Sequence, residues 1–543
     1  METRLSASRI LCVALLACSL MLNDNGLNGY LEAVKLDVRP GDASGWQIVR
    51  ITYRDRADLE RLAAWLDVWE VHPELDLVVA RVGLAEYQQL LRAGYPVTID
   101  AARSLEPSVA PGLCYRTVDQ LYADQDLIAS TYPTLTQVIT IGTSYEGRPL
   151  LVLKLTNTTH DLLALPKPRF FLMADIHGRE FITPEAAMQF IKQLLEGYGH
   201  DAELTWLLDW REIYVLVTAN PDGHAHNELT YTYWRKNADP ANQSACPSDY
   251  GTDLNRNSSF QWGSAGASTF ICDETYRGAA PASELETQAI QNYVASLFPN
   301  QRGPLIADSA PMTTTGILIS LHSYSNLVLW PWGFEYDVAP NNAQLAQLGQ
   351  KLAGFNGYAP EQASGLYLTS GSTDDWSYGT LGIASYTFEM GSSLDGFLPD
   401  CTSYDTLIQP NLDALIYAAE VARAPYQNSP GPDAVSLTTA TLSDTVMVTV
   451  TITSGQVVSA AQVYLDTPPW ESGAPLPLPA ADGTFDQATE VVTATLPRSS
   501  LSFGRHTVFV RGQDVLGNWG AVSWASFDLS LPYSNYFPFV ARN

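Results

Sequence analysis

Two side chains that could share one metal ion lie three residues apart, in the segment His177-Gly-Arg-Glu180. The segment follows the apolar run Arg169–Ala174, so we expect it to form a loop between a strand and a helix. An imidazole and a carboxylate on such a loop can face one cation, and two histidines, one glutamate and a water form a known catalytic zinc site. The spacing alone is weak, because the eight histidines and 58 acidic residues give about one such pair by chance. A third ligand must come from elsewhere in the chain.

Other histidines also have spacings that could suit a metal, and each has a simpler interpretation. His200 and Glu203 repeat the His-x-x-acid spacing, but their polar surroundings are typical of a solvated helix end. His224 and His226 follow an Asn-Pro-Asp-Gly turn signal, which favours a loop role. His322 follows an apolar run and is expected at a strand end, although a buried histidine without a ligand role is the commoner case.

The elements that would position these residues alternate between strands and helices from about residue 114 to residue 426. A helix is expected over Val118–Ser130, and another is expected to be capped by Thr183, with Pro184 at its first position. The alternation predicts an α/β domain with a central mixed, largely parallel sheet flanked by helices and with catalytic groups at its strand ends. The expected strands are Val138–Ile141, Leu150–Leu155, Arg169–Ala174, Ile213–Thr218, Gly316–Leu321 and Ser385–Phe388.

Regions of a different pattern lie on either side of this alternation. Residues 46–100 predict a small α+β unit, and the stretch Ala101–Gly112, with two prolines, is typical of a linker. After Pro430 the helical spacing stops and short strands recur at regular intervals, which predicts an all-β sandwich. The elements expected in the first unit are the strands Trp46–Tyr53, Leu75–Val82 and Val97–Ile99 and the helices Asp58–Leu66 and Leu84–Ala93. The strands expected in the sandwich are Val435–Leu437, Val446–Ile452, Ala461–Tyr464, Glu490–Ala494 and His506–Arg511.

The charge and the N-terminal segment restrict the partners and the compartment. The 543 residues include 30 Lys and Arg against 58 Asp and Glu, a net charge of −28 that repels polyphosphate and excludes a nucleic-acid partner. Two arginines and a short apolar run predict an export signal over residues 1–25, so we expect a secreted or cell-surface protein. Lipidation of Cys18 stays an open alternative. No later run of 18 apolar residues occurs, so no transmembrane segment is expected after the signal.

The cysteines fit an exported chain with disulfide bonds. Two of the six cysteines lie in the predicted signal, and an even number therefore remains. A zinc site made of cysteines is disfavoured, because the chain has no Cys-x-x-Cys spacing. Four cysteines allow three connectivities, of which we favour one. It pairs Cys246 with Cys272 and Cys114 with Cys401.

Several short motifs occur in a fixed order along the α/β region, and together they resemble those of the funnelin-type zinc carboxypeptidases, the family of carboxypeptidases A, B and T. Any one of them is easily found by chance, but the complete ordered set is not. The resemblance covers more than half of the chain, from about residue 114 to residue 426. Its motifs are Ser144-Tyr-Glu-Gly-Arg148, His177-Gly-Arg-Glu180, Asn220-Pro-Asp-Gly223, Trp234-Arg-Lys-Asn237, Asp253-Leu-Asn-Arg-Asn257, His322-Ser-Tyr-Ser325, Tyr367 with Ser370-Gly-Ser-Thr-Asp-Asp-Trp376, and Thr387-Phe-Glu389.

The resemblance implies one zinc ion per catalytic domain, with His177, Glu180 and His322 as its ligands and a water in the fourth position. It implies that Glu389 is the general base, which takes the proton of the water and later passes one to the leaving amine. It also implies that Arg235 polarises the scissile carbonyl and stabilises the oxyanion.

Further matched positions imply substrate contacts. Asn255 and Arg256 match the pair that grips the terminal carboxylate, for which a planar guanidinium is well suited. Arg179 and Tyr324 match other peptide-binding positions, and Tyr367 matches a mobile tyrosine that closes over the substrate.

One position bears on specificity. Asp374 aligns where carboxypeptidase B-like enzymes carry an acid at the bottom of the pocket, which would pair with a C-terminal Lys or Arg. An alignment shifted by one residue would place Asp375 there instead. The stretch from Glu180 to His322 is longer than is usual in the family because of residues 299–315.

The expected function is a secreted zinc exopeptidase that acts on peptide or protein C-termini and that prefers basic residues. Residues 40–102 resemble an activation segment that covers the cleft until it is cleaved, with a permanent accessory domain as the alternative. The sandwich resembles immunoglobulin-like modules, which can contact surface polymers or act as spacers. The predicted division is a signal at 1–25, a prosegment-like α+β domain at 40–102, a linker at 103–113, a zinc carboxypeptidase domain at 114–428, an immunoglobulin-like sandwich at 433–531 and a tail at 532–543.

Two other functions remain open from the sequence. A zinc peptidase or amidase acting on cell-wall peptides would use the same apparatus. A non-catalytic peptide-binding or adhesion protein would use a dead peptidase scaffold, although the intact Glu389 argues against this alternative.

Overall fold

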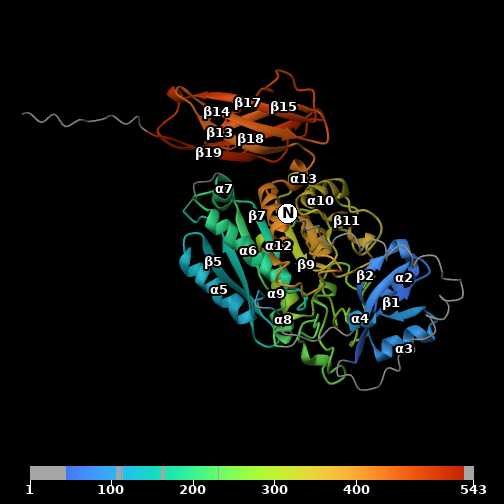
Figure 1. Cartoon of the computed structure of the whole chain (residues 1–543). Coiled ribbons are helices and arrows are strands. Elements are labelled where there is room, and N and C mark those ends of the chain that lie inside the picture. The colour runs from blue at the N-terminus through green and yellow to red at the C-terminus, as the bar shows by residue number, and fades with distance from the viewer. Residues whose placement is uncertain (1–44, 105–111, 113, 160–165, 230, 531–543) are drawn as a thin grey trace, which may run out of the picture. The chain divides into compact units, whose positions relative to one another are not determined.

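The structure is a computed structural model that describes residues 45–104, 112, 114–159, 166–229 and 231–530 (Figure 1). The predicted signal, Cys18, most of the predicted linker and the predicted tail lie outside the described residues. Within the described part of the chain, no helix is long and apolar enough to cross a membrane.

The small α+β unit expected at the N-terminal side forms a four-stranded sheet in the order β2-β3-β1-β4. Val49, Leu59, Leu62, Val78 and Leu90 belong to its buried core. The sequence missed its second strand, and a short helix, α4, covers residues 101–104 at the start of the predicted linker. The elements are β1 (Trp46–Thr52), α2 (Arg56–Ala63), β2 (Asp67–His72), η1 (Pro73–Leu75), β3 (Leu77–Gly83), α3 (Leu84–Arg92), β4 (Val97–Ile99) and α4 (Ala101–Ser104).

An eight-stranded mixed sheet forms the centre of the chain, in the order β11-β10-β12-β9-β7-β8-β6-β5. The four inner strands β12, β9, β7 and β8 are mutually parallel, which confirms the predicted fold class. The predicted strands are present, and the sequence missed β10 and β11. The bounds are β5 (Thr136–Thr143), β6 (Pro149–Leu155), β7 (Arg169–Met173), β8 (Glu212–Leu216), β9 (Ile317–His322), β10 (Leu327–Trp330), β11 (Ala359–Gln362) and β12 (Ala384–Glu389).

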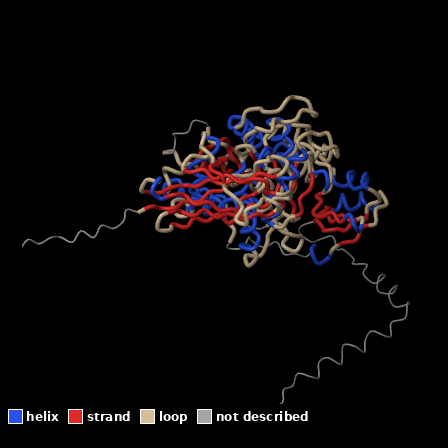
Figure 2. Tube along the Cα trace, turned by 90° about the horizontal axis from the view of Figure 1, so that it is seen from above, coloured by secondary structure: helices blue, strands red, loops and turns tan. Residues whose placement is uncertain are grey.

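Helices lie beside these strands (Figure 2). α12 packs against α6 and α10, whereas α5 and α9 contact β5. The predicted cap at Thr183 is wrong, because α6 begins at Ile182, two residues before the predicted first position, and the Thr183 hydroxyl bonds to the preceding loop instead. The helices are α5 (Val118–Thr131), α6 (Ile182–Gly197), α7 (Ala202–Trp210), α8 (Pro221–His226), α9 (Leu285–Leu297), α10 (Asn342–Asn356), α11 (Thr373–Trp376), α12 (Tyr404–Val421) and α13 (Pro425–Asn428), with shorter turns η2 (Pro240–Asn242), η3 (Leu254–Arg256), η4 (Ala363–Gly365) and η5 (Ser377–Leu381).

Both favoured disulfides are present. Cys114 bonds to Cys401 and Cys246 bonds to Cys272.

The C-terminal strands form two antiparallel sheets with one shared apolar core, as expected for a β-sandwich. Trp524 of the sandwich stacks on Trp206 of α7, with ring centroids 3.8 Å apart. Its Nε1 donates a hydrogen bond to the carbonyl oxygen of Ala202. The strands are β13 (Asp433–Thr441), β14 (Thr445–Thr453) and β17 (Thr489–Pro497) in one sheet, and β15 (Val458–Leu465), β16 (Leu476–Pro477), β18 (Gly504–Asp514) and β19 (Ser523–Leu529) in the other, with turns η6 (Pro469–Glu471) and η7 (Arg498–Ser500).

Candidate active site

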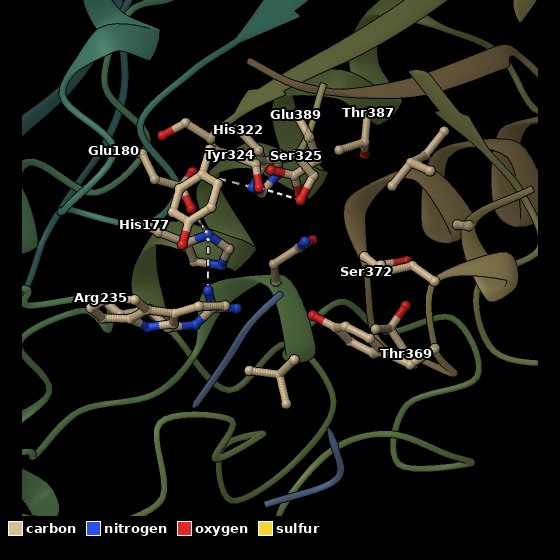
Figure 3. Close-up of a pocket in the computed structure, with 18 of the residues that line it drawn as sticks. His177, Glu180, Arg235, His322, Tyr324, Ser325, Thr369, Ser372, Thr387 and Glu389 are labelled. Carbon is tan, nitrogen blue, oxygen red and sulfur yellow. Dashed lines mark hydrogen bonds and ion pairs between the residues drawn. The ribbon is translucent and has the colours of Figure 1, made fainter. Parts of the chain in front are cut away.

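Three potential metal ligands converge at the carboxyl ends of two neighbouring parallel strands (Figure 3). His177 and Glu180 lie on the loop after β7, and His322 is the last residue of β9. One donor atom from each lies within 4.8 Å of the others, and all three side chains are buried. Parallel strands end at the same edge of a sheet, so residues distant in sequence meet there.

The chemistry of this donor set fits a divalent cation. Nδ1 of His177 lies 2.7 Å from Oε1 of Glu180, and Nδ1 of His322 lies 3.3 Å from Oε2. This Oε2 is buried and makes no protein hydrogen bond, so a carboxylate oxygen remains available to a cation. Although burial opposes ionisation, the two imidazoles hold the pKa of Glu180 well below its usual range.

Glu389 lies directly beside this group. It ends β12, and the parallel register of β12 and β9 pairs it with His322. Burial raises the pKa of Glu389 to about 7. A carboxyl group with such a pKa can take up and release a proton near neutral pH.

Arg235 is held in place by a residue to which the sequence assigned no role. Its Nη2 and Nε lie 2.8 and 3.1 Å from Oδ2 of Asp253, whose other oxygen is 3.2 Å from Nε2 of His177. One buried carboxylate thus orients both a predicted ligand and a predicted oxyanion donor. Asp253 opens one of the recognised motifs, so the sequence offered a signal for it.

All the predicted ligands, catalytic groups and substrate-binding residues line one cavity of about 90 Å³. The carbonyl oxygen of Gly266 accepts from Nε of Arg256, and Oδ1 of Asn255 accepts from the amide of Thr373. The cavity lining includes His177, Arg179, Glu180, Arg235, Asn255, Arg256, His322, Tyr324, Tyr367, Asp374 and Glu389.

The two neighbouring acids near this cavity have different environments. Asp375 is fully buried and accepts hydrogen bonds from the amides of Gly333 and Phe334. Asp374 lines the cavity, and within the described residues it forms no ion pair with a lysine or an arginine. Of the two acids, Asp374 is therefore the one that faces the cavity.

Residues of strand β2, in the N-terminal unit, also line this cavity. Both guanidinium nitrogens Nη1 and Nη2 of Arg179 bind the Asp67 carboxylate, at 2.6 and 2.7 Å. The hydroxyl of Tyr324 donates to Glu70 at 3.0 Å, and Arg103 donates to the same hydroxyl at 2.8 Å. Two predicted peptide-binding residues are thus bound by the chain itself.

The remaining histidines among the described residues lie outside the cavity lining. The expectation of a loop role for His224 and His226 is wrong, because both belong to helix α8, which begins with Pro221. His224 is buried, and His226 makes a partly exposed contact with Glu146. His200 is exposed, as expected for a solvated helix end.

The chain is similar to known proteins in both sequence and fold. The zinc carboxypeptidase family matches residues 121–412. Carboxypeptidase A1 of Rattus norvegicus is 32% identical over 378 residues, which cover 68% of this chain and 83% of that protein. Carboxypeptidase B of Bos taurus is 33% identical over 284 residues, 51% of this chain and 63% of that protein. The crystal structure of carboxypeptidase A from Helicoverpa armigera has the same fold, with a TM-score of 0.56, 22% identity and coverage of 70% of this chain and 98% of that one.

The chain belongs to the zinc carboxypeptidase family, as its motifs indicated. It is a carboxypeptidase A/B-like exopeptidase, a hydrolase whose substrates are peptide C-termini and whose family implies a zinc cofactor.

Proposed function

We propose that this protein is a secreted zinc carboxypeptidase in which His177, Glu180 and His322 hold the metal. The observation that carries the proposal is the convergence of their donor atoms within 4.8 Å beside Glu389. When bound, the cation supplies a Lewis acid and lowers the pKa of a coordinated water.

The protein groups then have separate tasks. Glu389 accepts a proton from the attacking water and delivers one to the leaving amine. Arg235, which Asp253 orients, donates to the carbonyl oxygen as negative charge develops on it. Asn255 and Arg256 bind the terminal carboxylate, and Tyr367 covers the bound residue. These positions restrict cleavage to the last peptide bond of a substrate.

Asp374 supports a preference for C-terminal lysine and arginine. Its side chain is 4% exposed and reaches the cavity without a cationic partner in the described residues. A basic substrate side chain would supply the missing charge, whereas an apolar one would leave a buried carboxylate unpaired.

The N-terminal unit supports a latent form of the enzyme. Val68, Trp69, Glu70 and Val71 of β2 line the cavity, and Asp67 occupies Arg179. The uncleaved chain is therefore proposed to be inactive until the segment near residues 101–113 is cut. Incubation with a general protease tests this, and an unchanged activity after removal of the unit would reject it.

Secretion is supported by two disulfides, which persist in oxidising compartments, and by the predicted signal. Cell fractionation with sequencing of the mature N-terminus tests it. Recovery of the full-length chain in the cytosol would contradict it.

A panel of peptides that differ only in the last residue, with and without a chelator, tests the activity. We expect release of C-terminal lysine and arginine, loss of turnover with the chelator, and a loss of at least about a thousandfold in kcat for Glu389→Gln. Activity on muropeptides but not on L-peptides would favour the cell-wall alternative. Unchanged turnover of Glu389→Gln would overturn the mechanism.

A further inference from the structure

A buried pair of titratable side chains lies next to the loop that carries His177 and Glu180. Asp175 and His224 are both 0% exposed, and Nδ1 of His224 lies 3.1 Å from Oδ2 of Asp175. Neither residue lines the catalytic cavity. The chemistry described above uses neither of them.

The His224 ring has a polar neighbour on each side. Nε2 donates to the carbonyl oxygen of Arg116 at 3.0 Å, and Nδ1 lies 3.1 Å from Oδ2 of Asp175. The same Oδ2 accepts from the hydroxyl of Thr218 at 2.6 Å.

This pair contacts the metal-binding loop on both sides. Asp175 precedes His177 by two residues, and its amide donates to the hydroxyl of Thr183, which donates in turn to the carbonyl oxygen of Glu180. On the other side, the His224 ring stacks on Phe181, the residue after Glu180, with centroids 4.0 Å apart. The two ligands are thus enclosed between Asp175 and His224.

The backbone leaves little freedom between the loop and helix α8. A Cβ at Gly178 would lie 2.1 Å from the carbonyl carbon of Gly223 and 2.6 Å from the amide nitrogen of His224. Asp175 itself has a φ of 60°, a conformation that aspartate tolerates better than most residues. A shift of His224 would therefore be transmitted directly to the loop.

We propose that Asp175 and His224 are positioning residues, whose buried contact holds His177 and Glu180 in the geometry that a divalent cation requires. The inference rests on the ligand assignment in the proposed function. Outer contacts that fix a ligand side chain typically change metal affinity or activity by about 10- to 100-fold when they are removed.

The test compares Asp175→Asn, His224→Gln and the double variant in the full chain. Asparagine keeps the acceptor for Thr218 and tolerates the positive φ, while glutamine keeps a donor for the Arg116 carbonyl oxygen. His226→Gln is the matched control, because His226 lies on the same helix and also contacts a carboxylate, Glu146, at 2.8 Å.

Zinc affinity is measured by competition with a chromophoric chelator on the metal-free chain, and ligand geometry by the absorption spectrum with Co²⁺. We expect each single variant to weaken zinc binding by about 10- to 100-fold and to alter the Co²⁺ bands.

We expect kcat to fall while KM stays within about twofold, since the substrate contacts are untouched. We expect the double variant to bind zinc about as tightly as the single variant with the lower affinity, because all three variants lose the same contact. His226→Gln stays within about twofold throughout.

Normal zinc affinity and Co²⁺ spectra in both single variants would overturn the inference, even if their melting temperatures fell. If Asp175→Asn does not fold, His224→Gln decides alone. Two other results would contradict the proposed function instead. If the wild-type chain bound no zinc, or if His322→Ala kept full zinc affinity, the ligand assignment itself would be wrong.

Discussion

The two regions that flank the peptidase fold contact it through different sets of side chains. The N-terminal unit forms ion pairs, Asp67 with Arg179 and Arg81 with Glu274, beside a ring contact of Trp69 with Phe397. The main contact of the sandwich is aromatic, with Trp524 stacked on Trp206 and Trp470 edge-on to the same Trp206 ring. The first contact closes over the cavity, whereas the second lies on α7 and includes no predicted site residue.

We propose that this difference separates a removable contact from a permanent one. In the proposed function a peptide substrate needs the groups that the carboxylates of the N-terminal unit occupy, so we expect substrate and unit to exclude each other. The aromatic contact buries apolar surface that would otherwise face water, and no substrate replaces it. The sandwich is also anchored at its start, because Lys351 and Tyr417 both bind the Asp433 carboxylate.

The largest effect is expected from Asp67→Ala in the uncleaved chain. Arg179 is 1% exposed, and removal of its partner leaves a buried charge uncompensated, at a cost of about 3–5 kcal/mol. Detachment of the unit relieves this cost, so activity before cleavage should rise by at least about 100-fold. Turnover of a C-terminal lysine peptide measures it.

Arg50→Ala is the control for that experiment, since it breaks an exposed ion pair with Asp100 on the same unit. A similar gain of activity in both variants would mean that general loosening of the unit, and not the contact with Arg179, causes latency.

Trp206→Ala should instead affect stability and leave latency unchanged. Loss of a large buried ring stacked on Trp524 is expected to cost about 3–5 kcal/mol in the free energy of unfolding. Urea denaturation measures this cost. Phe503→Ala, which truncates a 60% exposed ring of the sandwich, should change stability by less than about 0.5 kcal/mol. Equal losses in the two variants would show that the stacked contact has no special role.

The sequence predicted the region of the active site well for a physical reason. Strands β7, β9 and β12 are buried on both faces, so they appear as continuous apolar runs, and functional groups follow at their ends. His177, His322 and Glu389 all lie at such ends. Their convergence, however, followed from the family motifs, because spacing alone left His322 as an ordinary buried histidine.

The failures of the sequence analysis occur where polar side chains have distant partners. Strand β2 was missed because Asp67 and Glu70 interrupt its apolar residues, and their partners Arg179 and Tyr324 lie far along the chain. Thr183 was assigned to a helix cap for the same reason, since its hydroxyl bonds to Glu180 and Asp175 instead. Local patterns carry no information about such contacts.

A smaller effect is expected from Arg103→Gln. Arg103 binds Glu70 at 2.6 Å and the Tyr324 hydroxyl at 2.8 Å, but its side chain is 22% exposed and water partly screens the pair. The variant should raise the activity of the uncleaved chain by only about five- to tenfold, equivalent to about 1 kcal/mol. It should also reduce the sensitivity of latency to NaCl, which is measured as activity against salt concentration. A gain as large as that of Asp67→Ala would contradict the ranking of the two contacts.

The smallest effect concerns pH and Glu86 of α3. Burial, together with the charges of Asp273 and Glu274 across the contact, raises the pKa of Glu86 to about 8. The contact between the N-terminal unit and the peptidase region thus favours the protonated carboxyl, so the stability of this contact falls as pH rises from about 4.5 to about 8 and is constant above that.

Because Glu86 is partly exposed, we expect only about a threefold rise in the activity of the uncleaved chain relative to the cleaved enzyme between pH 6 and 9. Glu86→Gln should abolish this slope, and an unchanged slope would place the pH dependence outside this group of acids.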